Sequence, residues 1–157
     1  MIAPCNTDTP QVALHAPGVY TFYRAQVTPT SYVAWVAGAT TFATPAAAAA
    51  AMNSIKSVEK TCPKLTVTTN GGASTNRRIV SGPNTINGWP GYRTVDIFTF
   101  TVGKESRTVR TVDQYFTKGN VVVDVTLLDG AHITTTKGAI ASVNAAAAAI
   151  TKQLAAG

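Results

Sequence analysis

The sequence predicts an α+β fold, an antiparallel β-sheet meander with alanine-rich helices packed on it, from three observations. Two alanine-rich segments carry larger apolar residues at helical spacing, one before residue 62 and one at the end of the chain. Between them, segments of alternating apolar and polar residues are separated by Gly, Asn and Pro. Two more strand-like segments precede the first helix. The expected element order is therefore β-β-α-β-β-β-β-β-α.

The first helix is expected to begin at Pro45 and to run to about Thr61. Thr44 is a favoured N-cap residue, and Pro is favoured at the first helical position. Apolar residues recur on one side at Met52, Ile55, Val58 and Cys62. Pro63 ends the segment, because Pro cannot continue a helix.

The second helix is expected from about Gly138 to Leu154, after a run of three threonines. Its apolar stripe consists of Ile140, Val143, Ala147, Ile150 and Leu154. The alanines beside this stripe are small, so we expect this helix to lie close against the sheet.

Seven segments are expected to form strands, at residues 19–25, 32–42, 65–69, 77–81, 92–102, 107–117 and 121–128. Residues 81–84 and 87–91 are rich in Gly, Pro and Asn, and we expect them to form a loop from Ser81 to Gly91. In the last strand, Val121, Val123, Val125 and Leu127 share one face. The opposite face, with Val122, Asp124, Thr126 and Leu128, is half polar, so it is expected to be partly solvated or to line a groove.

The composition predicts one globular domain spanning residues 1–157, of which residues 1–17 form an N-terminal arm. With 45% hydrophobic and 13% charged residues, the chain is too apolar for a disordered protein and too poor in charge for a coiled coil. The net charge of +6 is compatible with anionic polymers or lipids. The basic residues are scattered, however, and no nucleic-acid signature is present, so no nucleic-acid partner is expected.

The two cysteines, Cys5 and Cys62, favour a disulfide that pins the N-terminal arm, if the protein is exported. The bridge would close a loop of about 58 residues and contribute roughly 4 kcal/mol. Lipid attachment at Cys5 and free thiols remain alternatives. The two histidines, His15 and His132, have no ligand-like spacing to the cysteines. We therefore expect neither a metal site nor a cofactor.

No catalytic motif is present, and the expected protein is not an enzyme and has no catalytic residues. The alternative is a small, cone-shaped α+β enzyme with a pocket carboxylate, resembling ketosteroid isomerases. Asp96 and Asp113 lie on neighbouring predicted strands and would supply its base. Surface pairing of Asp96 with Arg93, or of Asp113 with Arg110, would explain the same residues without catalysis.

One group of residues combines aromatic rings with arginines on a predicted loop and sheet edge, which would suit stacking on a ring or binding of an anion. The predicted ligand-binding residues are Trp89, Tyr92, Arg93, Arg107, Arg110 and Tyr115. The competing interpretation is that Trp89 and Tyr92 fill the end of the hydrophobic core.

Four segments carry a family resemblance: residues 41–47 (TFATPAA), residues 55–63 with the Cys-Pro end of the helix, residues 115–125 with Lys118-Gly119-Asn120, and the alanine-rich terminal helix. From Val33 to Ala155 the chain resembles the PknH-type extracellular sensor domain of actinobacteria. This family occurs at the outer end of receptor Ser/Thr kinases and as free-standing exported proteins or lipoproteins. Its kinase members carry two disulfides, whereas this chain can form only one.

The resemblance implies an antiparallel sheet with helices and a cleft for an extracellular signal, with no established catalytic residues. We therefore expect an exported, ligand- or partner-binding protein of the cell envelope, located outside the cell, whose signal or anchor lies outside this sequence. The expected partner is a small molecule, a cell-wall ligand or an envelope protein. A third alternative is binding of an anionic wall polymer or lipid through the basic surface, at the membrane or wall.

Overall fold

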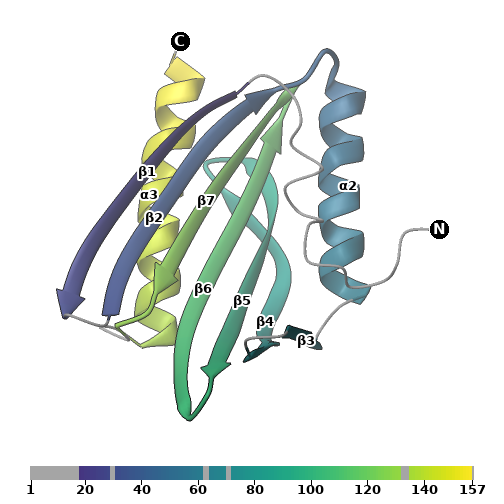
Figure 1. The fold of residues 1–157 in the computed structure, drawn as a ribbon. Coiled ribbons are helices and arrows are strands. Elements are labelled where there is room, and N and C mark those ends of the chain that lie inside the picture. Colours follow the sequence, from purple (N-terminus) through teal and green to yellow (C-terminus); the bar gives the residue numbers. More distant parts are fainter. Residues whose placement is uncertain (1–17, 29–30, 62–63, 70–71, 132–134, 157) are drawn as a thin grey trace.

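The computed structural model describes residues 18–28, 31–61, 64–69, 72–131 and 135–156, and the side chains of 33–57, 75, 77–101, 103–131 and 135–156. These residues form a seven-stranded antiparallel sheet and two helices, which confirms the α+β class (Figure 1). The elements are β1 (Gly18–Thr28), β2 (Ser31–Thr41), α2 (Pro45–Thr61), β3 (Lys64–Thr69), β4 (Gly72–Ile86), β5 (Trp89–Val102), β6 (Glu105–Lys118), β7 (Val121–Asp129) and α3 (Thr136–Ala156). Their order along the chain is the predicted one.

The strand order in the sheet is β1-β2-β7-β6-β5-β4-β3. Only β3 to β7 form a meander, and the β1–β2 hairpin pairs with the far side of β7. Helix α2 carries the chain from β2 to β3 at the opposite edge. The expectation of a simple meander is therefore wrong for the first two strands. A helix follows β2 where a tight turn would have set the next neighbour, so no local signal fixes its second partner.

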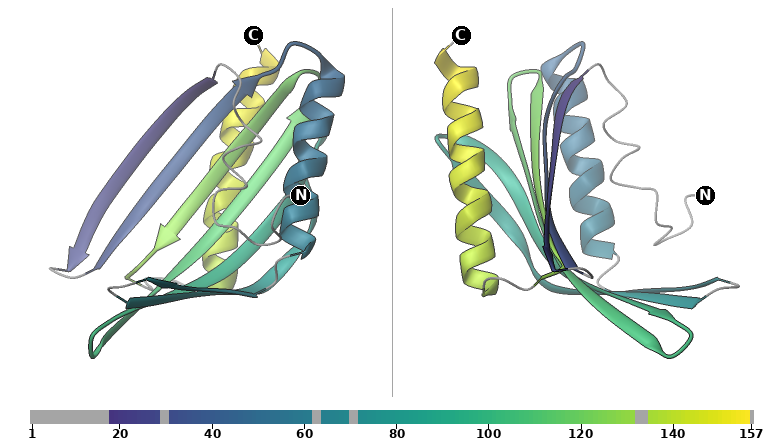
Figure 2. Two further views of the ribbon diagram at one scale, coloured as in Figure 1. Left: turned by 45° about the vertical axis from the view of Figure 1, so that its right-hand side comes forward. Right: turned by 60° about the vertical axis from the view of Figure 1, so that its left-hand side comes forward.

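The two helices lie on opposite faces of the sheet, α3 on one and α2 on the other (Figure 2). Because successive side chains on a strand point to opposite faces, each central strand contributes to both sides. On β6, Phe116 packs in the cluster with α3, while its neighbour Tyr115 packs in the cluster with α2. On β7, Val123 and Val122 divide in the same way.

The larger core lies between the sheet and α3. It contains Trp89, Val95, Val112, Phe116, Val123, Val125 and Leu127 of the sheet. Helix α3 buries a face of small side chains, Ala139, Val143, Ala147 and Thr151. The predicted stripe is confirmed for Val143 and Ala147, which are buried, and for Ile140 and Ile150, which pack against the core. It is wrong for its last residue, Leu154, which is 43% exposed. The sheet supplies the large side chains of this core, so the helix approaches it with its smallest face.

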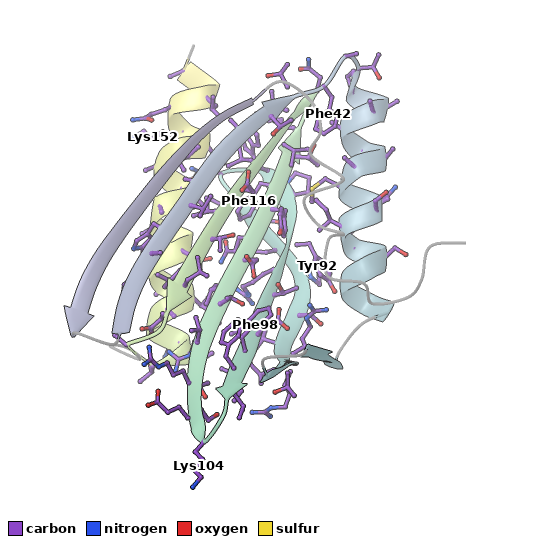
Figure 3. The ribbon with its side chains drawn as sticks, in the orientation of Figure 1. Phe42, Tyr92, Phe98, Lys104, Phe116 and Lys152 are labelled. Atoms are coloured by element: carbon purple, nitrogen blue, oxygen red, sulfur yellow. The ribbon has the colours of Figure 1, made fainter. Side chains whose placement is uncertain are left out.

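The smaller core lies between the sheet and α2, where Ala48, Met52 and Ile55 pack on Tyr115 and Val122. Figure 3 labels Phe42 and Tyr92, which border this cluster. The backbone N–H of Ala47 donates to Thr44 Oγ1 at 3.1 Å, which confirms the predicted N-cap of α2. The Asn120 side chain donates to the carbonyl oxygen of Phe42 at 2.9 Å and holds the start of α2 at the β6–β7 turn.

The expected loop from Ser81 to Gly91 is wrong, because β4 continues to Ile86 and β5 begins at Trp89. The connection is a two-residue turn in which Asn87 and Gly88 have φ angles of 51° and 74°, the arrangement of a type I′ hairpin. Pro83 is tolerated since β3 pairs only with residues 72–77 of β4, which leaves this part of β4 an edge.

Gly91 is the position where the fold most strictly requires glycine. A Cβ atom there would lie 2.6 Å from Phe116 Cδ1 and closer still to the Tyr115 carbonyl oxygen. We expect Gly91→Ala to lower the free energy of unfolding by about 1–3 kcal/mol in urea denaturation. The control is Gly82→Ala on the neighbouring strand, where nothing lies within 4 Å. That control is expected to be neutral or slightly stabilising, and equal losses in both variants would contradict this packing.

Candidate functional site

Beyond the α2 cluster, the side chains on that face of the sheet change from apolar to polar. On β5 the alternation leads from Tyr92 to Thr94 and Asp96, and on β6 from Tyr115 to Asp113 and Thr111. On β7 and β4 the corresponding residues pair with these in register. We call this set the polar band: Arg78, Thr94, Asp96, Thr111, Asp113, Asp124 and Thr126. It includes the half-polar face of the last strand that the sequence predicts.

Four members of the polar band form two pairs inside it. Arg78 Nε lies 3.2 Å from Asp96 Oδ1, and Arg78 Nη2 donates to Asp96 Oδ2 at 3.2 Å. This two-point contact matches the planar guanidinium to the carboxylate. Thr126 Oγ1 donates to Asp113 Oδ1 at 2.7 Å, between directly opposed residues of β6 and β7.

Three other polar atoms of the band have no such partner. Asp124 Oδ1, Thr94 Oγ1 and Thr111 Oγ1 are buried without a hydrogen-bond partner among the residues that the structure describes. Thr94 is 0% exposed, and it lies directly opposite Asp113 in the β5–β6 register. Buried polar groups in folded proteins are nearly always hydrogen-bonded. These are therefore polar atoms whose hydrogen-bonding capacity no described residue satisfies.

The electrostatics of the band are dominated by desolvation. Burial, and after it the nearby charge of Asp96, raise the pKa of Asp113 to about 6, against the lowering effects of the hydrogen bond from Thr126 and of the positive charge of Arg78. Burial also raises the pKa of Asp124 to about 6. Neither carboxylate forms an ion pair within the described residues. At neutral pH the face therefore carries an excess of negative charge, since Arg78 is in direct contact with Asp96 and also acts on Asp113.

The structure does not bring the six predicted ligand-binding residues onto one surface. Trp89 is 3% exposed in the α3-side core, as the competing interpretation expected for this ring. Arg93 and Arg110 lie on the same α3 face, where Arg110 Nη1 lies 3.3 Å from Asp129 Oδ2. Tyr92 and Tyr115 are opposed on the other face, beneath α2.

The sixth residue, Arg107, is exposed and lies 3.5 Å from Glu105 near the tip of the β5–β6 hairpin. Lys104, at that tip in Figure 3, is remote from both helices. By contrast, Asp96 and Asp113, which the sequence placed on neighbouring strands, do lie on one face within the polar band. The predicted surface pairings of these aspartates with Arg93 and Arg110 are replaced by Arg78 and Thr126.

Sequence reasoning missed Arg78, and a bulge explains why. The β4–β5 register shifts between Arg78 and Val80, so the strand holds an extra residue at Ile79. Strict alternation would place Arg78 on the same face as Val80, toward α3. The bulge turns it to the α2 face, opposite Asp96. No residue in this segment predicts the bulge.

Cys5, Cys62, His15 and His132 lie outside the described residues, so the disulfide stays a prediction. Within the described part of the chain, no three His, Cys, Asp or Glu side chains are grouped to hold a metal ion. Neither α2 nor α3 has a stretch long and apolar enough to cross a membrane. No family model, curated protein or solved structure matches this chain.

Two of the three threonines of the band, Thr94 and Thr126, should respond oppositely to loss of their hydroxyl groups. Thr94→Val removes a buried hydroxyl without a partner, so we expect the free energy of unfolding to rise by up to about 1 kcal/mol. Thr126→Val removes the hydrogen bond to Asp113 and should lower it by about 1–3 kcal/mol at neutral pH. Urea denaturation of the two variants measures both changes in the free energy of unfolding. Equal destabilisation would show that Thr94 has a structural partner.

The raised pKa values of Asp113 and Asp124 predict a stability that falls as pH rises. Both carboxyls bind protons in the folded state up to about pH 6, but in the unfolded state only up to their ordinary value of 3.8. The stabilisation of the folded state by these protonated carboxyls is complete below pH 3.8 and is lost as the pH rises through 6. Between pH 5 and 7.5, each group should lower the free energy of unfolding by about 1 kcal/mol. In urea denaturation, Asp113→Asn should show a smaller difference in the free energy of unfolding between pH 5 and pH 7.5 than the parent. An unchanged difference would contradict a raised pKa for Asp113.

Proposed function

We propose that this chain is an exported, non-enzymatic ligand-binding domain of the cell envelope, and that its ligand binds on the polar band. The observation that carries the proposal is the pair of buried polar groups without described partners, Asp124 Oδ1 and Thr94 Oγ1, on a face that also holds Asp113. Export is supported by the family resemblance and by the two cysteines.

The energetic argument favours binding over a structural role. A buried polar atom without a partner destabilises a fold by about 1–3 kcal/mol, and an apolar side chain of the same shape would avoid this loss. Such departures from local consistency concentrate at functional sites. A ligand that supplies the missing hydrogen bonds would recover the loss when it binds.

Three members of the band, Arg78, Asp113 and Thr126, are partly rather than fully buried, and the Arg78 side chain is 10% exposed. Thr94 and Asp124 are 0% and 7% exposed, so a ligand would reach them past these neighbours. Tyr92 is also half-buried, and it lies between the band and the α2 cluster. The cleft implied by the family resemblance would then lie on this side of the sheet, beside α2. Of the six predicted ligand-binding residues, Tyr92 and Tyr115 share the band's face and would border the ligand.

A second candidate function is proton transfer by Asp113, the isomerase-like alternative. It is favoured by one observation: with a pKa of about 6, this carboxyl exchanges its proton near neutral pH beside a second carboxylate, Asp96. Turnover of a small apolar ketone that is abolished in Asp113→Asn and retained in Glu105→Gln would favour this candidate over simple binding.

Native mass spectrometry of the protein purified from the culture medium of its host tests the proposal. We expect the native protein to carry a discrete adduct that is lost on denaturation. We also expect the mass of the denatured chain to lie two hydrogens below that of the reduced chain, as one disulfide requires. The double variant Thr94→Val/Asp124→Asn should lose the adduct. Glu105→Gln, which removes an exposed carboxylate of the hairpin tip, should keep it.

An adduct retained by the double variant would place the ligand elsewhere. Failure to recover the protein from the medium would contradict export, and the same variants can then be compared in protein purified from the cells.

A further inference from the structure

We infer that the ligand of the polar band carries a cationic nitrogen, such as a protonated amine, and that this group binds between Asp113 and Asp124. The inference deepens the proposed function and rests on it. It comes from the balance of charge on this face of the sheet, from the hydrogen-bonding capacity of its unpartnered atoms, and from the spacing of the two carboxylates.

The charge balance follows from the side chains that face the band. Arg78 and Asp96 form an ion pair and neutralise each other. On β2, the residues that pair with Asp124 and Thr126 are Gly38 and Val36, which carry no charge. The positive charge of Arg78 also acts on Asp113. The band therefore holds one described cation against three carboxylates, Asp96, Asp113 and Asp124, and its ionised form has two more negative charges than positive ones.

The remaining charged groups around this face lie outside the band. Lys56 of α2 is half-buried and forms no ion pair with any described carboxylate. Arg24 of β1 pairs in register with Ala34, which pairs with Leu128. That register position is two strands away from Asp124 and four residues along the strand. Arg107 and Glu105 pair with each other at the exposed hairpin tip.

Hydrogen-bonding capacity selects the same class of ligand. Ionised carboxylates only accept hydrogen bonds, and the Thr94 hydroxyl can accept one as well. An ammonium group has three donors and no acceptor. It can therefore complement Asp113, Asp124 and Thr94 together. A neutral hydroxyl would satisfy fewer of these acceptors and leave the two charges uncompensated, and an anion would be repelled.

The spacing suits one small cation. Asp113 is opposed to Thr126 on β7, which makes Asp124 its diagonal neighbour across the β6–β7 ladder. Diagonal neighbours on one face of an antiparallel pair are about 7–8 Å apart, too far for direct contact of two short side chains. A group that donates to both can lie between them. Thr94 lies on β5, Asp113 on β6 and Asp124 on β7, so the proposed site spans three adjacent strands.

Matched probes that differ only in their head group test the inference: cyclohexylamine, cyclohexanol and cyclohexanecarboxylate. Their apolar ring is suited to the neighbours of the band on β5, Tyr92 and Phe98. Isothermal titration calorimetry with the full chain at pH 7.5 should detect binding of the amine. Asp113→Asn and Asp124→Asn should each weaken this binding at least about tenfold, while Glu105→Gln leaves it unchanged.

The amine should also bind at least about tenfold more weakly at pH 5 than at pH 7.5, because protonation of Asp113 and Asp124 removes the charges that hold it. Thermal unfolding of both Asn variants provides the folding control. They should be at least as stable as the parent at pH 7.5, so that weakened binding cannot be assigned to unfolding.

The outcomes separate this inference from the proposed function. If cyclohexanol binds as tightly as the amine, and Thr94→Val weakens both, the polar band binds ligands but not by their charge, and the inference is overturned alone. If the carboxylate binds best, the inference is likewise wrong. If no probe binds at about 10 mM, where a complex of millimolar affinity is mostly formed, both the inference and the proposed site are contradicted.

Discussion

Successive side chains of β5, β6 and β7 point to opposite faces of the sheet, so each of these strands must pack against α3 on one face and fit the α2 side on the other. Toward α3, the strands present apolar side chains such as Val112, Phe116 and Val125, which form the main core. Toward α2, the same strands are apolar beneath the helix and again beyond the polar band, at Phe98 and Val109. Helix α2 has 17 residues and is about 26 Å long, whereas the 14-residue strands β5 and β6 extend over about 46 Å. One helix of this length cannot cover that face, and the polar band occupies the part that follows the helix.

The α3 face of the sheet buries polar groups as well. Gln114 is 0% exposed, yet its Oε1 accepts from Asn84 Nδ2 at 3.0 Å and its Nε2 donates to Asn144 Oδ1 at 2.7 Å. This chain of amides is satisfied and links β4, β6 and α3. On the same face, Trp89 Nε1 and Arg93 Nε are buried without described partners, as Thr94 Oγ1 and Asp124 Oδ1 are on the opposite face. The opposite face differs because its unpartnered atoms lie beside two carboxyl groups whose pKa is raised by burial.

Much of the fold could be predicted because its signals are local. Thr44 and Pro45 mark the start of α2, and alternating residues mark each strand of the meander. Pairing of β2 with β7 could not be predicted, since it joins residues about 90 positions apart with a helix between them. The Asn87-Gly88 turn was present in the sequence but was outweighed by the nearby Pro and Gly residues, which this edge of the sheet tolerates.

The candidate site was predicted in part, for the same physical reason. Alternation alone identifies the half-polar face of β7 with Asp124, and the neighbouring strands bring Asp96 near Asp113. The bulge at Ile79, which turns Arg78 toward Asp96, has no local signal. The six aromatic and arginine residues were grouped by their closeness in sequence and by assumed strand pairing. Alternation divides them between two faces, so a joint site would have required knowing the register.

Two carboxyl groups of the polar band, Asp113 and Asp124, are held in a desolvated state that raises their pKa. Carbon NMR of selectively labelled aspartate, titrated from pH 3 to pH 8, measures the side-chain pKa of Asp113 and Asp124 directly, with assignment by the two Asn variants. The account predicts that both titrate near pH 6. Titration of both near the ordinary value of 3.8 would contradict it, because the band would then be solvated or already paired.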